Sequence, residues 1–210
     1  MQSNQKVHRG GSDPKGFDRI SRELFAPIYP VIAEQIIERT GMVNGYCLDV
    51  GCGTGALGRA LANRTDLDIT FFDQSPEMID LTIGYVSEEK LLDRSEFEIG
   101  DIHRLQFSDN TMDLVVSRGS APFWEDWERA FSEIFRVLKK GGHAYIGGGF
   151  GNATLRKEIA QKMDREGAKR PPKEAFERKK VLLPDILSAL NAAHSEVIDD
   201  ESGFWVHIIK

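Results

Sequence analysis

Residues 45–58 read Gly-Tyr-Cys-Leu-Asp-Val-Gly-Cys-Gly-Thr-Gly-Ala-Leu-Gly, and they give the strongest indication of the fold class. Their first half, GYCLDV, is a short apolar run, which predicts a buried strand. Glycines follow directly, and apolar residues at Leu57, Ala60 and Leu61 predict a helix after them. A strand, a glycine-rich turn and a helix in this order are typical of the point where an open α/β sheet binds its ligand.

The glycine pattern by itself fits two kinds of cofactor. G-x-G-x-x-G fits residues 53–58, and its relaxed form with a final alanine fits 51–56, as in a nicotinamide-dinucleotide site. Asp49, two residues before the first glycine, would repel a pyrophosphate and favour a ligand with an ammonium and a sulfonium group. Asp73 closes the next predicted strand and suits ribose hydroxyls in either class. Asp49 therefore favours the cationic ligand, and both ligand classes share the nucleoside.

Strands and helices alternate along most of the chain. Beyond 45–50, strands are predicted at 68–72, 97–99, 112–117, 143–147, 195–199 and 204–209. The last two are joined by a short connection at Glu201-Ser202-Gly203, which is too short for a parallel crossover and predicts an antiparallel hairpin. The helix with the clearest period runs from Trp127 past Leu138 to a stop at Gly141-Gly142, and another helix spans 183–194. We expect a Rossmann-like, doubly wound α/β fold: a mainly parallel seven-stranded sheet with an antiparallel C-terminal strand and helices on both faces.

Composition indicates one domain in the cytoplasm. The 210 residues carry 27 Lys+Arg and 33 Asp+Glu, and the net charge of -6 exerts no general pull on nucleic acid or an anionic membrane. We find no apolar run near the roughly 20 residues of a transmembrane helix and no signal peptide in the polar N-terminus. Cys47 and Cys52 suit neither a disulfide framework nor a zinc cluster. We expect no DNA partner, a disfavoured RNA partner, no membrane insertion, and a monomer or homodimer.

The single domain, residues 1–210, is expected to have four parts. An N-terminal arm and cap helices occupy 1–41, and the cofactor-binding core occupies 45–150. A helical insertion follows at 151–182, and the last helix and the C-terminal hairpin occupy 183–210.

Four segments carry a resemblance to one enzyme family. They are CLDVGCGTG (47–55), FFDQSPEMI (71–79), IGDIHRLQFSDNTMDLVVS (99–117) and AFSEIFRVLKKGG (130–142). In this order they resemble the motifs of class I S-adenosylmethionine-dependent methyltransferases, most closely the small-molecule branch that includes ubiquinone and menaquinone C-methyltransferases. The resemblance implies S-adenosyl-L-methionine as cofactor, S-adenosyl-L-homocysteine as product, and a small-molecule acceptor.

The resemblance also implies a set of cofactor-binding residues: Asp49, Gly51, Cys52, Gly53, Gly55, Asp73, Gln74, Met78, Asp101, Ile102 and Ser117. The glycines would shape the loop around the methionine part, with Asp49 facing the ammonium group, Ser117 nearby and Cys52 as a small spacer. Asp73 would hold the ribose hydroxyls. Four residues would surround the adenine, one of them accepting from its amino group: Gln74, Met78, Ile102 and the acceptor Asp101.

The loop after the fourth strand leaves the carboxyl end of that strand, where an acceptor must lie. Arg118 suits a carboxylate or phenolate of the acceptor, with a surface ion pair as the alternative. Phe123 and Trp124 either wall an apolar acceptor pocket or pack in the core. Tyr29, from the N-terminal helices, would form part of a cover that excludes water. No metal ligand and no catalytic residue is assigned, although three residues are weak candidates for a base: Tyr29, His103 and Glu125.

Residues 156–180 hold ten Lys/Arg against five Asp/Glu. Such a segment is either a solvated insertion that helps to cover the acceptor or a docking surface. Two alternatives to a small-molecule methyltransferase therefore stay open. One is a non-catalytic S-adenosylmethionine-binding module, and the other is an RNA or protein methyltransferase that docks its substrate through 156–180.

Overall fold

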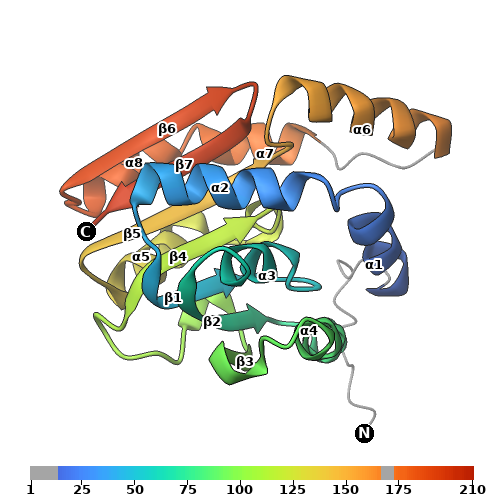
Figure 1. The fold of residues 1–210 in the computed structure, drawn as a ribbon. Helices are drawn as coiled ribbons and strands as arrows, with labels where there is room; N and C mark the ends of the chain where they lie inside the picture. Colours follow the sequence, from blue (N-terminus) through green and yellow to red (C-terminus); the bar gives the residue numbers. More distant parts are fainter. Residues whose placement is uncertain (1–13, 167–172) are drawn as a thin grey trace, which may run out of the picture.

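The computed structural model describes residues 14–166 and 173–210, which build one sheet with helices packed on both of its faces (Figure 1). The sheet has seven strands in the order β3-β2-β1-β4-β5-β7-β6. Neighbours from β3 to β5 are parallel, whereas β7 is antiparallel to both β5 and β6. The strands are β1 (Asn44–Val50), β2 (Asp66–Asp73), β3 (Ser95–Ile99), β4 (Met112–Arg118), β5 (Leu138–Gly149), β6 (His194–Asp200) and β7 (Gly203–Ile209). The predicted fold class is confirmed.

Two apolar cores lie on opposite faces of this sheet, because its buried strands direct alternate side chains to each face. Cys47 belongs to the core beneath α2, α3, α4 and α6, whereas the adjacent Leu48 belongs to the core beneath α5, α7 and α8. Figure 1 shows α2 and α3 in front of the strands and α5 and α8 behind them. The helices are α1 (Pro14–Glu23), α2 (Ile28–Thr40), α3 (Ala56–Ala62), α4 (Pro76–Glu88), α5 (Trp127–Val137), α6 (Ala153–Glu166), α7 (Lys173–Lys180) and α8 (Leu183–Ala189). Three short 3₁₀ turns add η1 (Leu92–Arg94), η2 (Ile102–Arg104) and η3 (Ala121–Phe123).

Local signals account for the ends of several helices. Gly41 ends α2 in the left-handed conformation, with φ 68° and its N–H bonded to the carbonyl of Ile37. Pro30 lies in the first turn of α2, where its missing N–H breaks no helical hydrogen bond. The Ser75 hydroxyl caps α4 by accepting from the N–H of Met78.

Two helix ends differ from the prediction. The helix beginning at Trp127 ends at Val137, and Leu138 already pairs with Met112 as the first residue of β5. Leu138 is fully buried, and a buried leucine fits the apolar spacing of a helix as well as that of a strand. The helical spacing of apolar residues therefore continues past Val137, where the helix ends. The helix predicted to reach residue 194 ends at Ala189, because Asn191 adopts a left-handed φ of 51°.

Some expectations fall outside the described residues. Most of the N-terminal arm lies in 1–13, and the Pro171-Pro172 break lies in 167–172. Within the described ranges, we find no helix that is both long enough and apolar enough to cross a bilayer.

The sheet order places the candidate site. From β1 the chain passes to β2 on one side, and β4 lies on the other side of β1. In open α/β sheets this switch point, at the carboxyl ends of the strands, is where ligands bind. The loops that follow β1, β2, β3 and β4 meet along this edge, which we call the carboxyl edge.

Candidate active site

The glycine loop between β1 and α3 is the centre of the carboxyl edge. Gly51, Gly53 and Gly55 all have left-handed φ angles, of 63°, 56° and 69°. The N–H groups of Gly51 and Cys52 both donate to the carbonyl of Phe72, at 2.8 and 3.1 Å. A Cβ at Gly51 would lie 2.4 Å from the Cβ of Ser120. The backbone therefore needs glycine here both for its dihedral angles and for its close approach to the loop after β4.

Asp73, the last residue of β2, holds this loop in place. One carboxylate oxygen accepts from the N–H of Gly53 at 2.9 Å, and the other accepts from the N–H of Ser75 at 3.0 Å. Burial raises the pKa of Asp73, and hydrogen bonds from backbone N–H groups of Ser75, Gly53 and Gln74 oppose that rise. A carboxylate has about four lone-pair sites, so the side chain can still accept from a ligand hydroxyl.

Asp49 lies beneath the loop and is only 1% exposed. Its carboxylate accepts from the N–H of Gly58 at 2.9 Å, which fixes the first turn of α3 against β1. Burial raises its pKa to about 7, the Gly58 hydrogen bond opposes the rise, and the charge of Asp73 adds to it. A cation bound near this carboxylate would favour its ionised form. Direct contact with a ligand ammonium stays a prediction.

Cys52 and Thr82 complete the packing of the loop. The Thr82 hydroxyl donates to the carbonyl of Gly53 at 2.8 Å, and the Cys52 sulfur lies 4.0 Å from that hydroxyl. Burial raises the pKa of the Cys52 thiol well above its usual value. A thiol that stays protonated is a poor nucleophile, which supports the interpretation of Cys52 as a spacer.

Asp101 follows β3 on the same edge. Its carboxylate accepts from the N–H and from Nδ1 of His103, at 3.0 and 2.6 Å, while 65% of its side chain stays exposed. The Nε2 of His103 accepts from the N–H of Asp126 at 3.1 Å. Both ring nitrogens are thus engaged, with the proton on Nδ1, so His103 orients Asp101 and is a poor candidate for a base. Ile102 is buried beside this pair.

The other predicted cofactor residues lie along the same edge. Gln74 is exposed between β2 and α4, and Met78 is buried in the first turn of α4. Ser117, near the end of β4, is fully buried, with its hydroxyl 2.6 Å from that of Ser120. The Ser120 hydroxyl also donates to the carbonyl of Val50 at 3.1 Å. Sequence reasoning missed Ser120, and the serines at both ends of the short 117–120 stretch were the available signal.

Helix α1 closes over the glycine loop. The Ser21 hydroxyl lies 3.1 Å from the hydroxyl of Tyr29 and 3.3 Å from that of Thr54 in the loop. Asp18, also on α1, accepts from the Tyr85 hydroxyl of α4 at 2.7 Å. Tyr29 is thus joined through Ser21 to the segment that packs over the glycine loop, and its part in covering an acceptor stays a prediction. Sequence reasoning missed Ser21, Thr54 and Asp18, because no local pattern marks contacts between distant segments.

Arg118 lies under this cover at the end of β4. Its guanidinium carbon is 4.7 Å from the ring centre of Phe25 and 5.6 Å from that of Tyr29. One terminal nitrogen donates to the carbonyl of Gly149 at 3.2 Å. Among the described residues, its buried Nε atom has no hydrogen-bond partner. None of the ion pairs found in the described residues includes Arg118, so the guanidinium is a cation with unused donors between two aromatic rings.

The two aromatic residues of the loop after β4 separate. Phe123 is 63% exposed, whereas Trp124 is buried in the core with its ring 6.1 Å from that of Phe131. Of the two interpretations left open, the structure places Trp124 in the core. Lys179 of α7 donates to the carbonyls of Pro122 and Trp124, which holds α7 against this loop.

Comparisons with known proteins agree with this geometry. A family of methyltransferase domains matches residues 48–146. A solved structure from Methanococcus maripaludis, a proposed S-adenosyl-L-methionine-dependent methyltransferase, is 42% identical with a TM-score of 0.86, over 100% of this chain and 97% of that one. The chain belongs to the S-adenosyl-L-methionine-dependent methyltransferase family. The nicotinamide alternative is therefore wrong.

Two further relatives show the range of this methyltransferase family. Sterol 24-C-methyltransferase erg6 of Aspergillus fumigatus is 32% identical over 120 residues, which are 55% of this chain and 32% of that protein. The chain thus spans about a third of the length of the first curated relatives it matches. The solved [4+2]-cyclase SpnF is 30% identical with a TM-score of 0.54, over 57% of this chain and 44% of that one.

The residues of the carboxyl edge fit the cofactor of the family. Asp73 and Asp101 offer carboxylates at the ends of neighbouring strands, which suits ribose hydroxyls and an amino group. Asp49 places a buried carboxyl group beneath the loop, and a ligand that carries positive charge would favour its ionised form. Acidic acceptors of this kind suit a cationic nucleoside better than a phosphate.

Proposed function

We propose that this chain transfers the methyl group of S-adenosyl-L-methionine to a small-molecule acceptor. The observation that carries the proposal is the carboxyl edge itself. The left-handed glycine loop, Asp73 and Asp101 lie at the ends of three adjacent strands. Arg118 lies at the end of the fourth, β4, under the cover made by α1 and α2. A cofactor half and an acceptor half therefore meet at one switch point.

Methyl transfer from a sulfonium requires few catalytic side chains. When bound, the cofactor would supply a methyl group on a sulfonium: an acceptor atom would form a bond to that carbon as the S–CH₃ bond breaks and its electron pair goes to sulfur. The chain has to align the two reactants and exclude water. An acceptor that carries a proton releases it to solvent or to a base. Because His103 is engaged at both ring nitrogens, the structure supports alignment more strongly than base catalysis.

Arg118 supports an acceptor with an anionic oxygen, either a carboxylate or a phenolate. Its guanidinium has unused donors and is flanked by the rings of Phe25 and Tyr29, which suits a planar, partly apolar molecule. A phenol that Arg118 holds in its ionised form has more electron density on its ortho and para ring carbons than the neutral phenol, which favours C-methylation. Methylation of a phenolic ring carbon agrees with the resemblance to ubiquinone and menaquinone C-methyltransferases, and the sterol 24-C-methyltransferase relative is also named for methylation at carbon.

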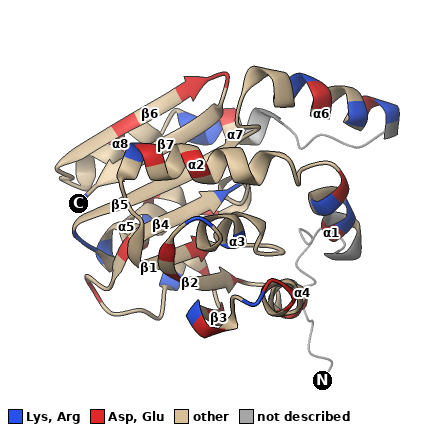
Figure 2. Ribbon diagram, in the orientation of Figure 1, with Lys and Arg blue, Asp and Glu red and all other residues tan. Residues whose placement is uncertain are grey.

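The segment 156–180 supports a cover better than a docking surface for RNA or protein. Figure 2 shows acidic as well as basic residues along α6. On α7, Lys179 is bonded to the loop after β4, and Lys180 is paired with Asp199 at 3.1 Å. Phe176 packs against Trp127 with ring centres 5.8 Å apart. Lysines whose ammonium groups are bonded within their own chain are less available to bind the phosphates of RNA. A location in the cytoplasm and a reduced state of both cysteines complete the proposal.

A non-catalytic or non-methylating role is the second candidate. It is favoured by the cyclase SpnF among the relatives, because the fold alone does not fix the activity. The two candidates share cofactor binding and differ in turnover.

The test has two stages. Calorimetric titration of the ligand-stripped chain is expected to give micromolar binding of S-adenosyl-L-methionine and S-adenosyl-L-homocysteine and none of NADH. A methyl-transfer assay against phenolic and carboxylate acceptors then compares Arg118→Ala with Arg64→Ala, an exposed residue between α3 and β2. We expect Arg118→Ala to lower kcat/KM at least tenfold with unchanged product affinity, and Arg64→Ala to change neither. Tight cofactor binding without methylation of any acceptor would favour the second candidate.

A further inference from the structure

A cluster of histidines and a glutamate lies at the β6–β7 edge of the sheet, apart from the candidate active site. His194 and Glu196 are two residues apart on β6, so both side chains lie on one face of the strand. His207 is directly opposite Glu196 on β7. One potential ligand atom from each of the three residues lies within 4.8 Å of the other two. The pairing of two strands thus brings together three groups that bind transition metals.

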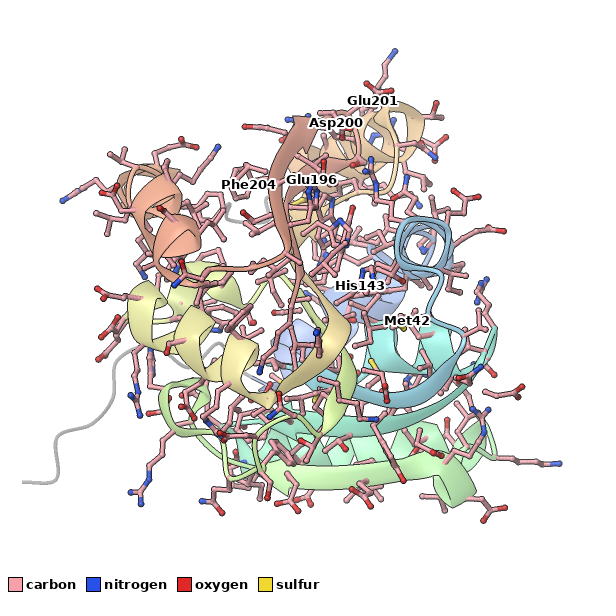
Figure 3. All side chains as sticks on the ribbon, turned by 90° about the vertical axis from the view of Figure 1, so that its left-hand side faces the viewer. Met42, His143, Glu196, Asp200, Glu201 and Phe204 are labelled. Carbon is pink, nitrogen blue, oxygen red and sulfur yellow. The ribbon has the colours of Figure 1, made fainter. Side chains whose placement is uncertain are left out.

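His207 is held as a metal-binding histidine should be. It is 5% exposed, its Nδ1 is 3.3 Å from a Glu196 oxygen, and its Nε2 is 2.9 Å from Nδ1 of His143 on β5. A hydrogen bond on the far nitrogen orients the ring of a ligating histidine. Burial lowers the pKa of both His143 and His207. Figure 3 views this side of the molecule and labels His143 and Glu196.

One cation competes for Glu196. Arg39, in the last turn of α2, has a terminal nitrogen 3.7 Å from the same Glu196 oxygen, and both side chains are about two-fifths exposed, at 41% and 40%. An exposed pair at that distance contributes little free energy, so a divalent ion can displace it. His194 is exposed, and its ring already lies against that of His207, with ring centres 6.0 Å apart.

We propose that His194, Glu196 and His207 bind one zinc-like divalent transition-metal ion, with water completing a tetrahedral set. Two imidazoles and one carboxylate suit zinc, whereas magnesium and calcium prefer oxygen ligands. The ion ties the edge strand β6 to β7. Because His143 pairs with Leu114 early in β4, whereas Ser117 and Arg118 lie at its end, the metal site is remote from the cofactor residues.

The experiment uses the full chain, stripped with EDTA and titrated with ZnCl₂ against a chromophoric chelator. We expect one ion per chain with submicromolar affinity. His194→Ala and Glu196→Gln each weaken it at least tenfold. Ser195→Ala, an exposed neighbour on the other face of β6, leaves the affinity unchanged. Retained zinc affinity in both ligand variants, or affinity weaker than 100 μM in the unmodified chain, overturns the proposal.

Thermal melting separates this site from the proposed function. Zinc at about a hundred times its Kd is expected to raise the Tm of the unmodified chain by roughly 5–10 °C, and to raise that of His194→Ala much less. The Kd of S-adenosyl-L-homocysteine stays the same with and without zinc. A zinc-dependent change in that Kd overturns the placement of the site away from the cofactor. If the chain binds zinc but transfers no methyl group, the proposed function is overturned and the metal site stands.

Discussion

The cofactor half and the acceptor half of the carboxyl edge are built in different ways. The cofactor half rests on backbone: left-handed glycines, N–H groups bonded to Asp73, and a cap at Ser75. The acceptor half rests on side chains from distant segments, such as Arg118 between Phe25 and Tyr29. Backbone conformation is a local property, whereas the second kind of contact depends on the whole fold. A family can therefore keep one half and vary the other, which accounts for one fold with many acceptors.

Gly51→Ala should have the largest effect, because it changes the backbone conformation on which the cofactor half depends. The new Cβ would lie 2.4 Å from that of Ser120, at a φ of 63° that alanine disfavours. We expect S-adenosyl-L-homocysteine to bind at least a hundredfold more weakly, with a stability loss of about 2 kcal/mol from strain and displacement of the loop. Titration calorimetry and denaturant unfolding measure the two effects.

Gly84→Ala is the matched control for that variant. A Cβ at Gly84 meets no atom within 4 Å, and the residue lies inside α4. Alanine there should stabilise the protein by about 0.5–1 kcal/mol and leave ligand affinity unchanged. Adding Ser120→Gly to Gly51→Ala removes the steric conflict and leaves the dihedral strain. Binding by Gly51→Ala within threefold of the unmodified chain would contradict our account of the loop.

Asp73→Asn should come next. An amide has one acceptor oxygen, so the variant must give up the N–H of Gly53 or that of Ser75, together with its capacity for ribose hydroxyls. We expect product affinity to fall about 30- to 100-fold, which corresponds to about 2–3 kcal/mol. The control is Asp68→Asn, an exposed residue on the same strand. An equal loss in both variants would show that the effect is not specific to the loop.

Asp49→Asn tests the buried charge through pH. The unfolded chain loses this proton near pH 4 and the folded chain near pH 7, so an ionising Asp49 lowers stability as pH rises between those values. The Asn variant lacks this decline and should melt several degrees higher than the unmodified chain at pH 8, but not at pH 5.

Asp49→Asn also tests the pH dependence of ligand affinity, which should run in the opposite direction to the pH dependence of stability. A cationic ligand favours ionised Asp49, so affinity for S-adenosyl-L-methionine should rise by up to about tenfold between pH 6 and pH 8. Because the ligand amine also titrates, the informative quantity is the difference between the unmodified chain and Asp49→Asn. Identical pH profiles would remove Asp49 from ligand recognition and leave it only its bond to Gly58.

Sequence reasoning reached the backbone half because its signals are local. Glycines after an apolar run predicted the turn, and Ser75-Pro76 predicted the start of α4. It placed Asp73 at the end of a strand, where the structure has it, and the family resemblance added Asp101, which the structure places just after β3. That they and the other assigned residues contact the cofactor stays a prediction, which the variants above test.

Sequence reasoning did not reach the contacts of the other half. From the sequence, Trp124 suited the wall of an acceptor pocket and the core equally well. Only the structure, which packs its ring against Phe131, distinguishes the two. Ser21 of α1 meets Thr54 of the loop across 33 positions of sequence, and no periodicity encodes that meeting. The sequence left His103 as a candidate base, because it does not show that Asp101 and Asp126 engage both ring nitrogens.

Lys179→Met should have the smallest effect and the most selective one. Lys179 holds α7 to the carbonyls of Pro122 and Trp124, in the loop that follows Arg118 of the acceptor half. We expect kcat/KM for the acceptor to fall about two- to fivefold, because a loosened cover aligns the acceptor less well. Product affinity should stay the same, and the exposed Arg178→Met on the same helix should alter neither. Weaker binding of S-adenosyl-L-homocysteine by Lys179→Met would mean that α7 also supports the glycine loop. The two halves would then be one mechanical unit, and the independence of acceptor from cofactor that we infer for this edge would not hold.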